Sequence, residues 1–244
     1  SSWEINATLP EGLSFGSTNG TIWGTPTELW TQTSYMVWAN NSGGSSVAYL
    51  NITVVDELPM ISYTPATLDL TNNTVSADLP LAPTITGAGE ITSWEINATL
   101  PDGLSFGATN GTIWGTPTEL WTATAYMVWA NNSGGSSVAY LNITVVDELP
   151  GLSYNPNNLE LTNNTQSSDF PLNPTIIGSG EITSWEINST LPAGINFGTS
   201  NGTIWGTPTE LWNTTAYTVW ANNSGGSSVA YLNITVIDEL PGLT

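Results

Sequence analysis

The chain has 244 residues, of which twenty are Asp or Glu and none is Lys, Arg, His or Cys, so its formal net charge is −20. This composition argues against nucleic acid and anionic membrane surfaces as partners, because both are bound through cationic side chains. It also excludes disulfides, zinc sites with Cys or His ligands, and every catalytic mechanism based on His, Cys or Lys.

The chain consists of repeats. Trp3, Trp94 and Trp185 occupy the same position in three copies of one motif, at a spacing of 91 residues. Residues 2–57 and 93–148 differ at only four places, which are Glu11/Asp102, Ser17/Ala108, Gln32/Ala123 and Ser34/Ala125. A unit of this length has the size of a small sandwich domain and is too long for one turn of a short solenoid.

The repeat boundaries predict an incomplete unit at 1–57 that lacks roughly two leading strands, complete units at 58–148 and 149–240, and the start of a further unit at 241–244. Three explanations are open for the incomplete unit. The sequence is a window from a longer array, or a further linking stretch belongs to the unit, or a neighbouring molecule supplies the strands by β-strand addition. Head-to-tail completion of this kind would give a homopolymeric filament.

In the middle unit, taken in chain order, four runs alternate between apolar and polar residues: 91–97, 103–106, 125–131 and 136–146. Such alternation predicts β-strands with one buried face. In the last run the residues expected to face the core are Ala139, Leu141, Ile143 and Val145. Turn-forming residues separate the runs, and no stretch has helical periodicity. The predicted fold is all-β, with immunoglobulin-like antiparallel β-sandwiches repeated in tandem.

A hairpin is predicted between Phe106 and Ile113. Asn110 and Gly111 lie between these two residues, and both residue types accept a positive φ. The pair therefore predicts a short turn that joins two strands.

The segment that follows the first strand resembles a known family. Residues 9–28, "LPEGLSFGSTNGTIWGTPTE", and their copies at 100–119 and 191–210 are similar to the motif of the He_PIG repeats, which are close to the cadherin-like repeats of archaeal and bacterial surface proteins. The resemblance covers nearly the whole of each unit. It implies tandem Ig-like sandwiches in an extracellular or envelope protein, and it implies no particular activity.

Two tryptophans in each unit are expected to point outward. In the He_PIG motif a small polar residue usually occupies the position that Trp23, Trp114 and Trp205 hold in this chain. By alternation these three face away from the core, as do Trp38, Trp129 and Trp220. They either cover the sheet or pack under a loop, or they form a contact surface for a partner.

Fifteen sequons of the form Asn-x-Ser/Thr are candidate N-glycosylation sites. Their asparagines are Asn6, Asn19, Asn40, Asn51, Asn72, Asn97, Asn110, Asn131, Asn142, Asn163, Asn188, Asn201, Asn213, Asn222 and Asn233. The strand sequons fall on the polar side of the alternation and the others in turns, so covalent N-glycans could project into water. The alternative is a polar β-protein with unmodified asparagines.

Acidic pairs recur where one unit meets the next, at Asp56 and Glu57, Asp147 and Glu148, and Asp238 and Glu239. Calcium at these junctions is one hypothesis, since carboxylates are its preferred ligands and no basic partner is present. The alternative is a solvated turn. Paired carboxylates can hydrolyse glycosides, but acids that recur in every unit indicate a structural role, so we expect no enzyme.

These features together predict a secreted surface protein, of archaeal type, that serves as the subunit or shaft of a glycosylated extracellular filament or stalk. No apolar run is long enough to span a membrane. The alternative function is an adhesin or carbohydrate-binding module that uses the exposed tryptophans to contact surface glycans.

Overall fold

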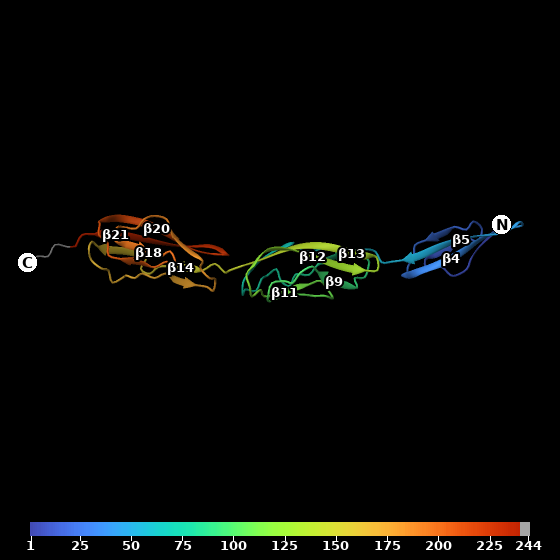
Figure 1. Cartoon of the computed structure of the whole chain (residues 1–244), viewed down its shortest axis with the longest axis horizontal. Coiled ribbons are helices and arrows are strands. Elements are labelled where there is room, and N and C mark those ends of the chain that lie inside the picture. Colours follow the sequence, from blue (N-terminus) through green and yellow to red (C-terminus); the bar gives the residue numbers. More distant parts are fainter. Residues whose placement is uncertain (240–244) are drawn as a thin grey trace, which may run out of the picture.

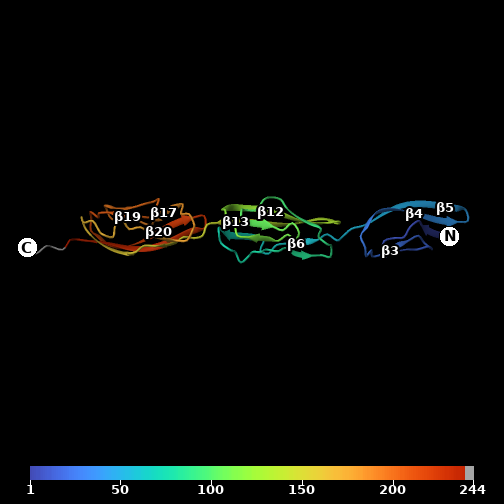
Figure 2. The same ribbon diagram turned by 90° about the horizontal axis from the view of Figure 1, so that it is seen from below.

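The computed structural model describes residues 1–239 of the chain. It shows three repeats in single file, with repeat 1 in blue, repeat 2 in green and repeat 3 in orange and red (Figure 1). The view turned by 90° shows the same row (Figure 2). Every regular element in the described part is a β-strand, so these residues contain no helix that could cross a membrane.

Repeat 1 contains β1 (Ser2–Ile5), β2 (Leu13–Phe15), β3 (Ile22–Gly24), β4 (Trp30–Asn41) and β5 (Gly44–Val54). Repeat 2 contains β6 (Met60–Ser62), β7 (Thr67–Thr71), β8 (Thr84–Thr86), β9 (Ser93–Ile96), β10 (Leu104–Phe106), β11 (Ile113–Gly115), β12 (Trp121–Asn132) and β13 (Gly135–Val146). Repeat 3 contains β14 (Gly151–Ser153), β15 (Asn158–Thr162), β16 (Thr175–Ile177), β17 (Ser184–Ile187), β18 (Ile195–Phe197), β19 (Ile204–Gly206), β20 (Trp212–Asn223) and β21 (Gly226–Ile237).

Repeat 2 is a two-layer sandwich. Its larger sheet has the order β7-β13-β12-β9, in which β12 pairs with β13 and β9 in antiparallel fashion and β7 pairs with β13 in parallel. The hairpin β10-β11 and the pair β6-β8 form smaller sheets, and a bridge joins Leu81 to Ile113. Repeat 3 has the same arrangement. The predicted all-β, Ig-like tandem fold is confirmed, and one parallel pair in each of these two repeats adds to its antiparallel sheets.

The core of repeat 2 lies between these layers. Tyr126, Val128 and Ala130 of β12 are fully buried, and the inward residues of β13 that the alternation predicted are at most 5% exposed. Leu68 and Leu70 of β7 complete the cluster from the other side of β13. The predicted alternation of the two long strands is therefore confirmed.

The hairpin between Phe106 and Ile113 is also confirmed, but its loop differs from the prediction. Phe106 pairs with Ile113, so residues 107–112 form the connection. Gly111 has a φ of +68°, whereas Asn110 does not adopt a positive φ. A Cβ on Gly111 would lie 2.4 Å from Cε3 of Trp94, so the loop folds over this buried ring. This close contact, rather than a two-residue turn, explains the glycine.

Repeat 1 has a three-stranded sheet of order β1-β4-β5 and the hairpin β2-β3. In repeat 2 the segment ahead of β9 contributes three strands, β6, β7 and β8, where the sequence predicted about two. Residues 1–57 contain no counterpart of these strands, so the outer edge of β5 has no strand partner among the described residues.

Candidate functional site

The acidic residues between repeats lie against the tip of the next β-hairpin. The backbone N–H of Asp56 donates to Oγ of Ser133 at 2.9 Å, and this hydroxyl donates to Oδ2 of Asp56 at 2.8 Å. The same two bonds join Asp147 to Ser224, at 2.8 and 3.0 Å. Each aspartate therefore fixes the linker to the repeat that follows it.

The glutamate beside each aspartate is held from two sides. Nδ2 of Asn132 donates to the backbone oxygen of Glu57 at 2.6 Å, and the N–H of Ala88 donates to its Oε2 at 3.2 Å. At the second junction the corresponding bonds to Glu148 come from Asn223, at 2.6 Å, and from Ser179, at 3.3 Å. The linker is thus clamped between a hairpin tip and a loop of the following repeat.

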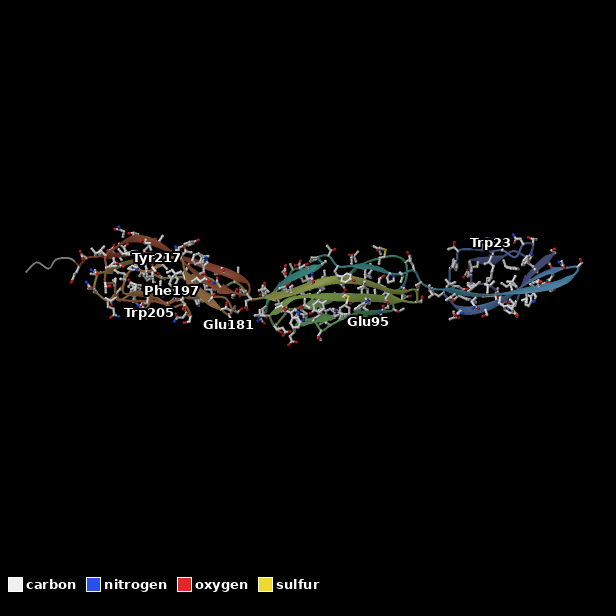
Figure 3. The ribbon with its side chains drawn as sticks, turned by 45° about the horizontal axis from the view of Figure 1, so that its top comes forward. Trp23, Glu95, Glu181, Phe197, Trp205 and Tyr217 are labelled. Atoms are coloured by element: carbon white, nitrogen blue, oxygen red, sulfur yellow. The ribbon has the colours of Figure 1, made fainter. Side chains whose placement is uncertain are left out.

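Glycines make this close approach possible. A Cβ on Gly89 would lie 1.9 Å from the backbone oxygen of Glu57, and one on Gly134 would lie 2.1 Å from that of Asp56. Gly180 and Gly225 meet the second linker in the same way, at 2.1 Å each. Figure 3 shows Glu181, the neighbour of Gly180, at the junction between repeats 2 and 3. A side chain at any of these glycines would displace the linker.

The junction carboxylates have protein donors as partners. Within residues 1–239 no three Asp, Glu, His or Cys side chains gather closely enough to share a metal ion. The third pair, Asp238 and Glu239, is exposed at the end of the described chain. Calcium at the junctions therefore stays a prediction, and the hydrogen bonds give the acidic pairs a structural role.

A second set of recurring acids closes a turn inside each repeat. Oε1 of Glu119 accepts the backbone N–H of Asp102 at 2.8 Å. The corresponding bonds are from Glu11 to Glu28, at 2.7 Å, and from Ala193 to Glu210, at 2.6 Å. The third bond persists although its donor residue is Ala193, which shows that the turn needs one carboxylate and no acidic pair.

Repeats 2 and 3 each contain a buried tyrosine that ties the leading segment to the hairpin loop. The hydroxyl of Tyr63 donates to the backbone oxygen of Gly111 at 2.5 Å, and that of Tyr154 donates to Gly202 at 2.6 Å. Burial raises the pKa of both hydroxyls well above the usual value of about 10. The hydroxyls are therefore neutral donors at ordinary pH.

The six outward tryptophans have two kinds of surroundings. Trp23, Trp114 and Trp205 lie on the short hairpins and are 53%, 41% and 42% exposed. In Figure 3, Trp205 lies at the outside of repeat 3, whereas Phe197 and Tyr217 lie between its layers. Trp114 lines a groove of about 470 Å³ together with Val75 and Leu79 of the leading segment.

Trp38, Trp129 and Trp220 lie on the outer face of the long strands and are half-buried. In repeat 2 the register places Trp129 opposite Val138, and Met127 opposite Tyr140. Tyr140 is 66% exposed, and its counterparts Tyr49 and Tyr231 are exposed to a similar degree. Tyr140 was not among the predicted contact residues, although its outward alternation next to Trp129 is a signal that could have identified it.

The sequon asparagines differ in exposure. Nine are exposed: Asn6, Asn19, Asn51, Asn97, Asn110, Asn142, Asn188, Asn201 and Asn213. Six are half-buried: Asn40, Asn72, Asn131, Asn163, Asn222 and Asn233. At Asn131 the amide Nδ2 donates to Oγ of Ser93 at 3.2 Å and to Oε1 of Glu95 at 3.1 Å. A glycan on this nitrogen would have to replace at least one of those bonds.

The junction partners Asn132 and Ser133 were not predicted. The sequence identified their "NNSGG" segment as a turn with a sequon. Ser133 lies 77 residues after Asp56 in the chain. No local pattern connects two residues so far apart, and only the recurrence of both segments in each repeat could have suggested the contact.

Comparison with known proteins gives three matches to one family. The profile of the family described as Putative Ig domain (He_PIG) matches residues 1–55, 59–146 and 150–237. The chain is also 31% identical over 133 residues to the protein named Serine-rich adhesin for platelets from Staphylococcus aureus strains MRSA252 and NCTC 8325. The match covers 53% of this chain but only 9% and 6% of those two proteins, so the chain spans less than a tenth of their length.

Solved structures of three Ig-like or cadherin domains in a row are similar at low identity. Extracellular domains 3–5 of Drosophila OTK match with a TM-score of 0.42 and 18% identity, over 94% of this chain and 78% of that one. An I-band fragment of titin matches with a TM-score of 0.39 and 13% identity, over 98% and 87%. Mouse cadherin-23 EC22-24 matches with a TM-score of 0.35 and 12% identity, over 98% and 86%.

Proposed function

Because the chain belongs to the Putative Ig domain (He_PIG) family, we propose that it is a structural shaft of a glycosylated extracellular filament or stalk. The observation that carries this proposal is the junction, where one set of hydrogen bonds recurs between Asp56 and Ser133 and between Asp147 and Ser224. A repeated junction of one geometry turns a row of sandwiches into a shaft with a regular repeat. The role is mechanical and needs no catalytic residue.

An extracellular location is supported by the relatives and by the composition. The curated relatives are named as adhesins, which are proteins of the cell surface. A chain with no Lys or Arg contains no bond that a trypsin-like protease cleaves, which suits exposure outside the cell. Its net charge of −20 keeps parallel shafts apart unless cations or specific contacts join them.

Glycosylation is supported by the nine exposed sequon asparagines, which occur in all three repeats. Sugars at these sites would cover polar strand faces and limit edge-to-edge association of the sheets. The half-buried asparagines, such as Asn131, are better suited to the hydrogen bonds that they already make.

Head-to-tail self-association would use the outer edge of β5. In repeat 2 the equivalent edge of β13 pairs in parallel with β7, from Asn142 with Thr67 to Val146 with Thr71. A strand donated to β5 in the same register would cover Leu50, Ile52 and Val54, which are only partly buried in repeat 1. Such strand addition between copies forms a linear polymer.

Cryo-electron microscopy of native material, combined with glycopeptide mass spectrometry, tests this proposal. We expect filaments with a longitudinal repeat, a strand beside β5 in the position of β7, and sugar density on exposed asparagines such as Asn97 and Asn142. Isolated compact particles under native conditions would contradict the filament, and bare asparagines would contradict the glycosylation.

An adhesive function is the second candidate, and the outer face of the long strands favours it. Trp129, Val138 and Tyr140 form an apolar strip on repeat 2, and the residues at these positions recur on the other two repeats. Exposed aromatic rings of this kind can stack on sugars or dock against a protein. Binding to a glycan array that is lost in Tyr140→Ser, with self-association measured separately by light scattering, would place adhesion ahead of the structural role.

A further inference from the structure

Repeat 2 has a surface groove in which a sequon and a tryptophan lie together. Asn110, Thr112 and Trp114 form one wall, and Val75, Leu79 and Pro80 of the leading segment form the other. The groove has a volume of about 470 Å³, which falls in the range of about 300–1,000 Å³ typical of small-ligand sites. Its lining is mostly apolar, although it is open to solvent.

The orientation of Asn110 is fixed with its amide nitrogen free. Oδ1 of Asn110 accepts the backbone N–H of Thr112 at 3.0 Å, and Nδ2 has no hydrogen-bond partner in the part of the chain that the structure describes. A Cβ on Gly107 would lie 2.1 Å from Oδ1 of Asn110 and 3.2 Å from Cζ3 of Trp114. Asn110 and the indole ring therefore lie side by side over Gly107.

On the premise of the glycosylation proposed above, we infer that this groove seats the first sugar ring of a glycan attached to Nδ2 of Asn110. The linkage forms when Nδ2 displaces a phosphate leaving group from C1 of an activated sugar donor and loses one proton. The sugar then stacks one C–H face on Trp114, and Val75 closes the opposite side. Trp114 acts as a platform for a glycan of its own repeat.

Two properties of the chain favour a tethered sugar over a second copy of the protein as the occupant. A neutral sugar adds no charge, whereas a second copy brings another net charge of −20 to an acidic surface. A sugar bound to Asn110 is also held beside the groove covalently, so its effective concentration is high and a weak contact suffices.

The three repeats provide a natural series for this inference. The same Asn-Gly-Thr sequon and tryptophan occur in each, and Oδ1 of Asn19 and Asn201 accepts the same backbone bond, at 3.1 Å in both. Repeat 1 has no counterpart of the Val75 wall within residues 1–57, and Trp23 is correspondingly more exposed. Among the described residues the groove is therefore best formed in repeat 2, and residues 1–57 supply only the wall that carries Trp23.

Repeat 3 has both walls but a different lining. Gln166 replaces Val75, and Oγ1 of the sequon residue Thr203 donates to Oδ1 of Asn173 at 2.9 Å. In repeat 2 the residue equivalent to Asn173 is Ala82, so no such bond crosses the groove. We expect the seat in repeat 3 to be intermediate between the other two.

The test uses the whole chain secreted from an N-glycosylating host. Peptides from the sites are distinguishable by mass because Ser17 in repeat 1 is replaced by Ala108 in repeat 2. After occupancy is established, a peptide N-glycosidase is applied to the folded protein, and release of the glycan is followed at each site. We expect release from Asn110 to be about threefold to tenfold slower than from Asn19, because the Val75 wall holds the sugar against Trp114, whereas Trp23 has no such wall within residues 1–57.

Variants show whether Trp114 is the cause. Trp114→Ala should raise the release rate at Asn110 at least to that at Asn19, and Trp114→Phe should keep most of the protection. Trp23→Ala should change release at Asn19 by a smaller factor, because no second wall holds the sugar against Trp23 within residues 1–57. If Trp114→Ala does not fold, Val75→Gln serves instead, since Val75 is 79% exposed and glutamine is the residue of repeat 3. Nuclear Overhauser contacts between the first sugar and the indole of Trp114 are expected in the unaltered protein.

Equal release from Asn110 and Asn19, or no response to Trp114→Ala and Val75→Gln, would overturn the inference. Sugar on other sequons but none on Asn110 would overturn it while leaving the proposed glycosylation intact. Bare asparagines at all fifteen sequons would overturn both.

Discussion

Repeats 1 and 2 have nearly the same sequence over residues 2–57 and 93–148, yet their cores differ. In repeat 2 the inward residues of β13, such as Leu141 and Ile143, are buried. In repeat 1 the equivalent Leu50 and Ile52 are only half-buried, and within residues 1–57 the buried apolar side chains are Pro10, Tyr35 and Val37. The long hairpin keeps its register in both.

The difference shows that pairing and burial depend on different parts of a repeat. The hairpin of β12 and β13 forms from local alternation and a short turn, so its copy β4-β5 forms as well. The core is completed by the leading segment, because Leu68 and Leu70 of β7 extend the inward face of the larger sheet and Leu81 joins the same buried cluster from the layer of β11. Stability of a repeat should therefore depend on a segment that lies outside the shared sequence.

The largest expected effect comes from removing part of that segment. Leu68→Ala deletes a fully buried side chain of β7 and should lower the free energy of unfolding of repeat 2 by about 3 kcal/mol. Hydrogen exchange of β13 amides should then approach that of β5. Urea unfolding followed by hydrogen-exchange mass spectrometry measures both quantities.

Met60→Ala is the matched control, since Met60 belongs to the same leading segment but is largely exposed. Its effect on unfolding should be within about 0.5 kcal/mol. Protection of β13 that survives Leu68→Ala would show that the leading segment does not account for the difference between the repeats.

The second effect concerns the junction and uses two equivalent glycines. A Cβ on Gly134 would lie 2.1 Å from the backbone oxygen of Asp56, whereas one on Gly43 meets only Oδ1 of Asn41, at 3.2 Å. Gly134→Ala should break the two bonds between Asp56 and Ser133, which corresponds to about 2 kcal/mol and about thirtyfold faster exchange of the Asp56 amide. Small-angle scattering should show a less extended chain.

Gly43→Ala tests the same sequence change without a linker in contact. We expect no change in the scattering profile and no change at Asp56. Similar effects from both substitutions would mean that the glycines serve the hairpin turn and that the junction does not depend on them.

These comparisons indicate which features the sequence could reveal. Alternation along residues 136–146 predicted the buried face of β13 correctly, because it depends only on neighbours in the chain. The parallel pairing of Asn142 with Thr67 was not predictable in this way, since it joins residues 75 positions apart and either edge of the hairpin could accept a strand. The hydrogen bond from Asn131 to Glu95 could not be predicted for the same reason. The sequon of Asn131 therefore could not be distinguished from the sequons of exposed asparagines.

Alkaline pH should reveal a smaller difference in stability between the repeats. Because burial raises the pKa of Tyr63, the folded repeat favours the neutral hydroxyl. Its stabilising contribution is complete below the unfolded pKa of about 10 and is lost as the pH rises toward the folded pKa, at about 1.4 kcal/mol per pH unit. Repeat 2 should lose protection above pH 10 before residues 1–57, which contain no counterpart of Tyr63.

Tyr63→Phe checks this assignment. The variant loses the bond to Gly111 and should be less stable at neutral pH, but its stability should change less between pH 9 and pH 11 than that of the unaltered protein. Hydrogen exchange resolved by repeat gives the comparison. An unchanged pH dependence in Tyr63→Phe would assign the alkaline transition to another group.

The smallest effect tests whether one of the four sequence differences, Ser34 in repeat 1 against Ala125 in repeat 2, causes the contrast between these repeats. Ser34 donates from Oγ to Oδ1 of Asn51 at 2.6 Å, and Ala125 in repeat 2 cannot make the equivalent bond to Asn142. Since the bond is exposed, Ser34→Ala should cost about 0.5 kcal/mol, and Ala125→Ser should add a similar amount to repeat 2. Neither change should alter the burial of β5 or β13, because the substituted side chains lie on the solvent face. If Ser34→Ala changes the hydrogen-exchange rate of the β5 amides by more than about tenfold, this substitution, and not the leading segment, would account for the contrast between the repeats.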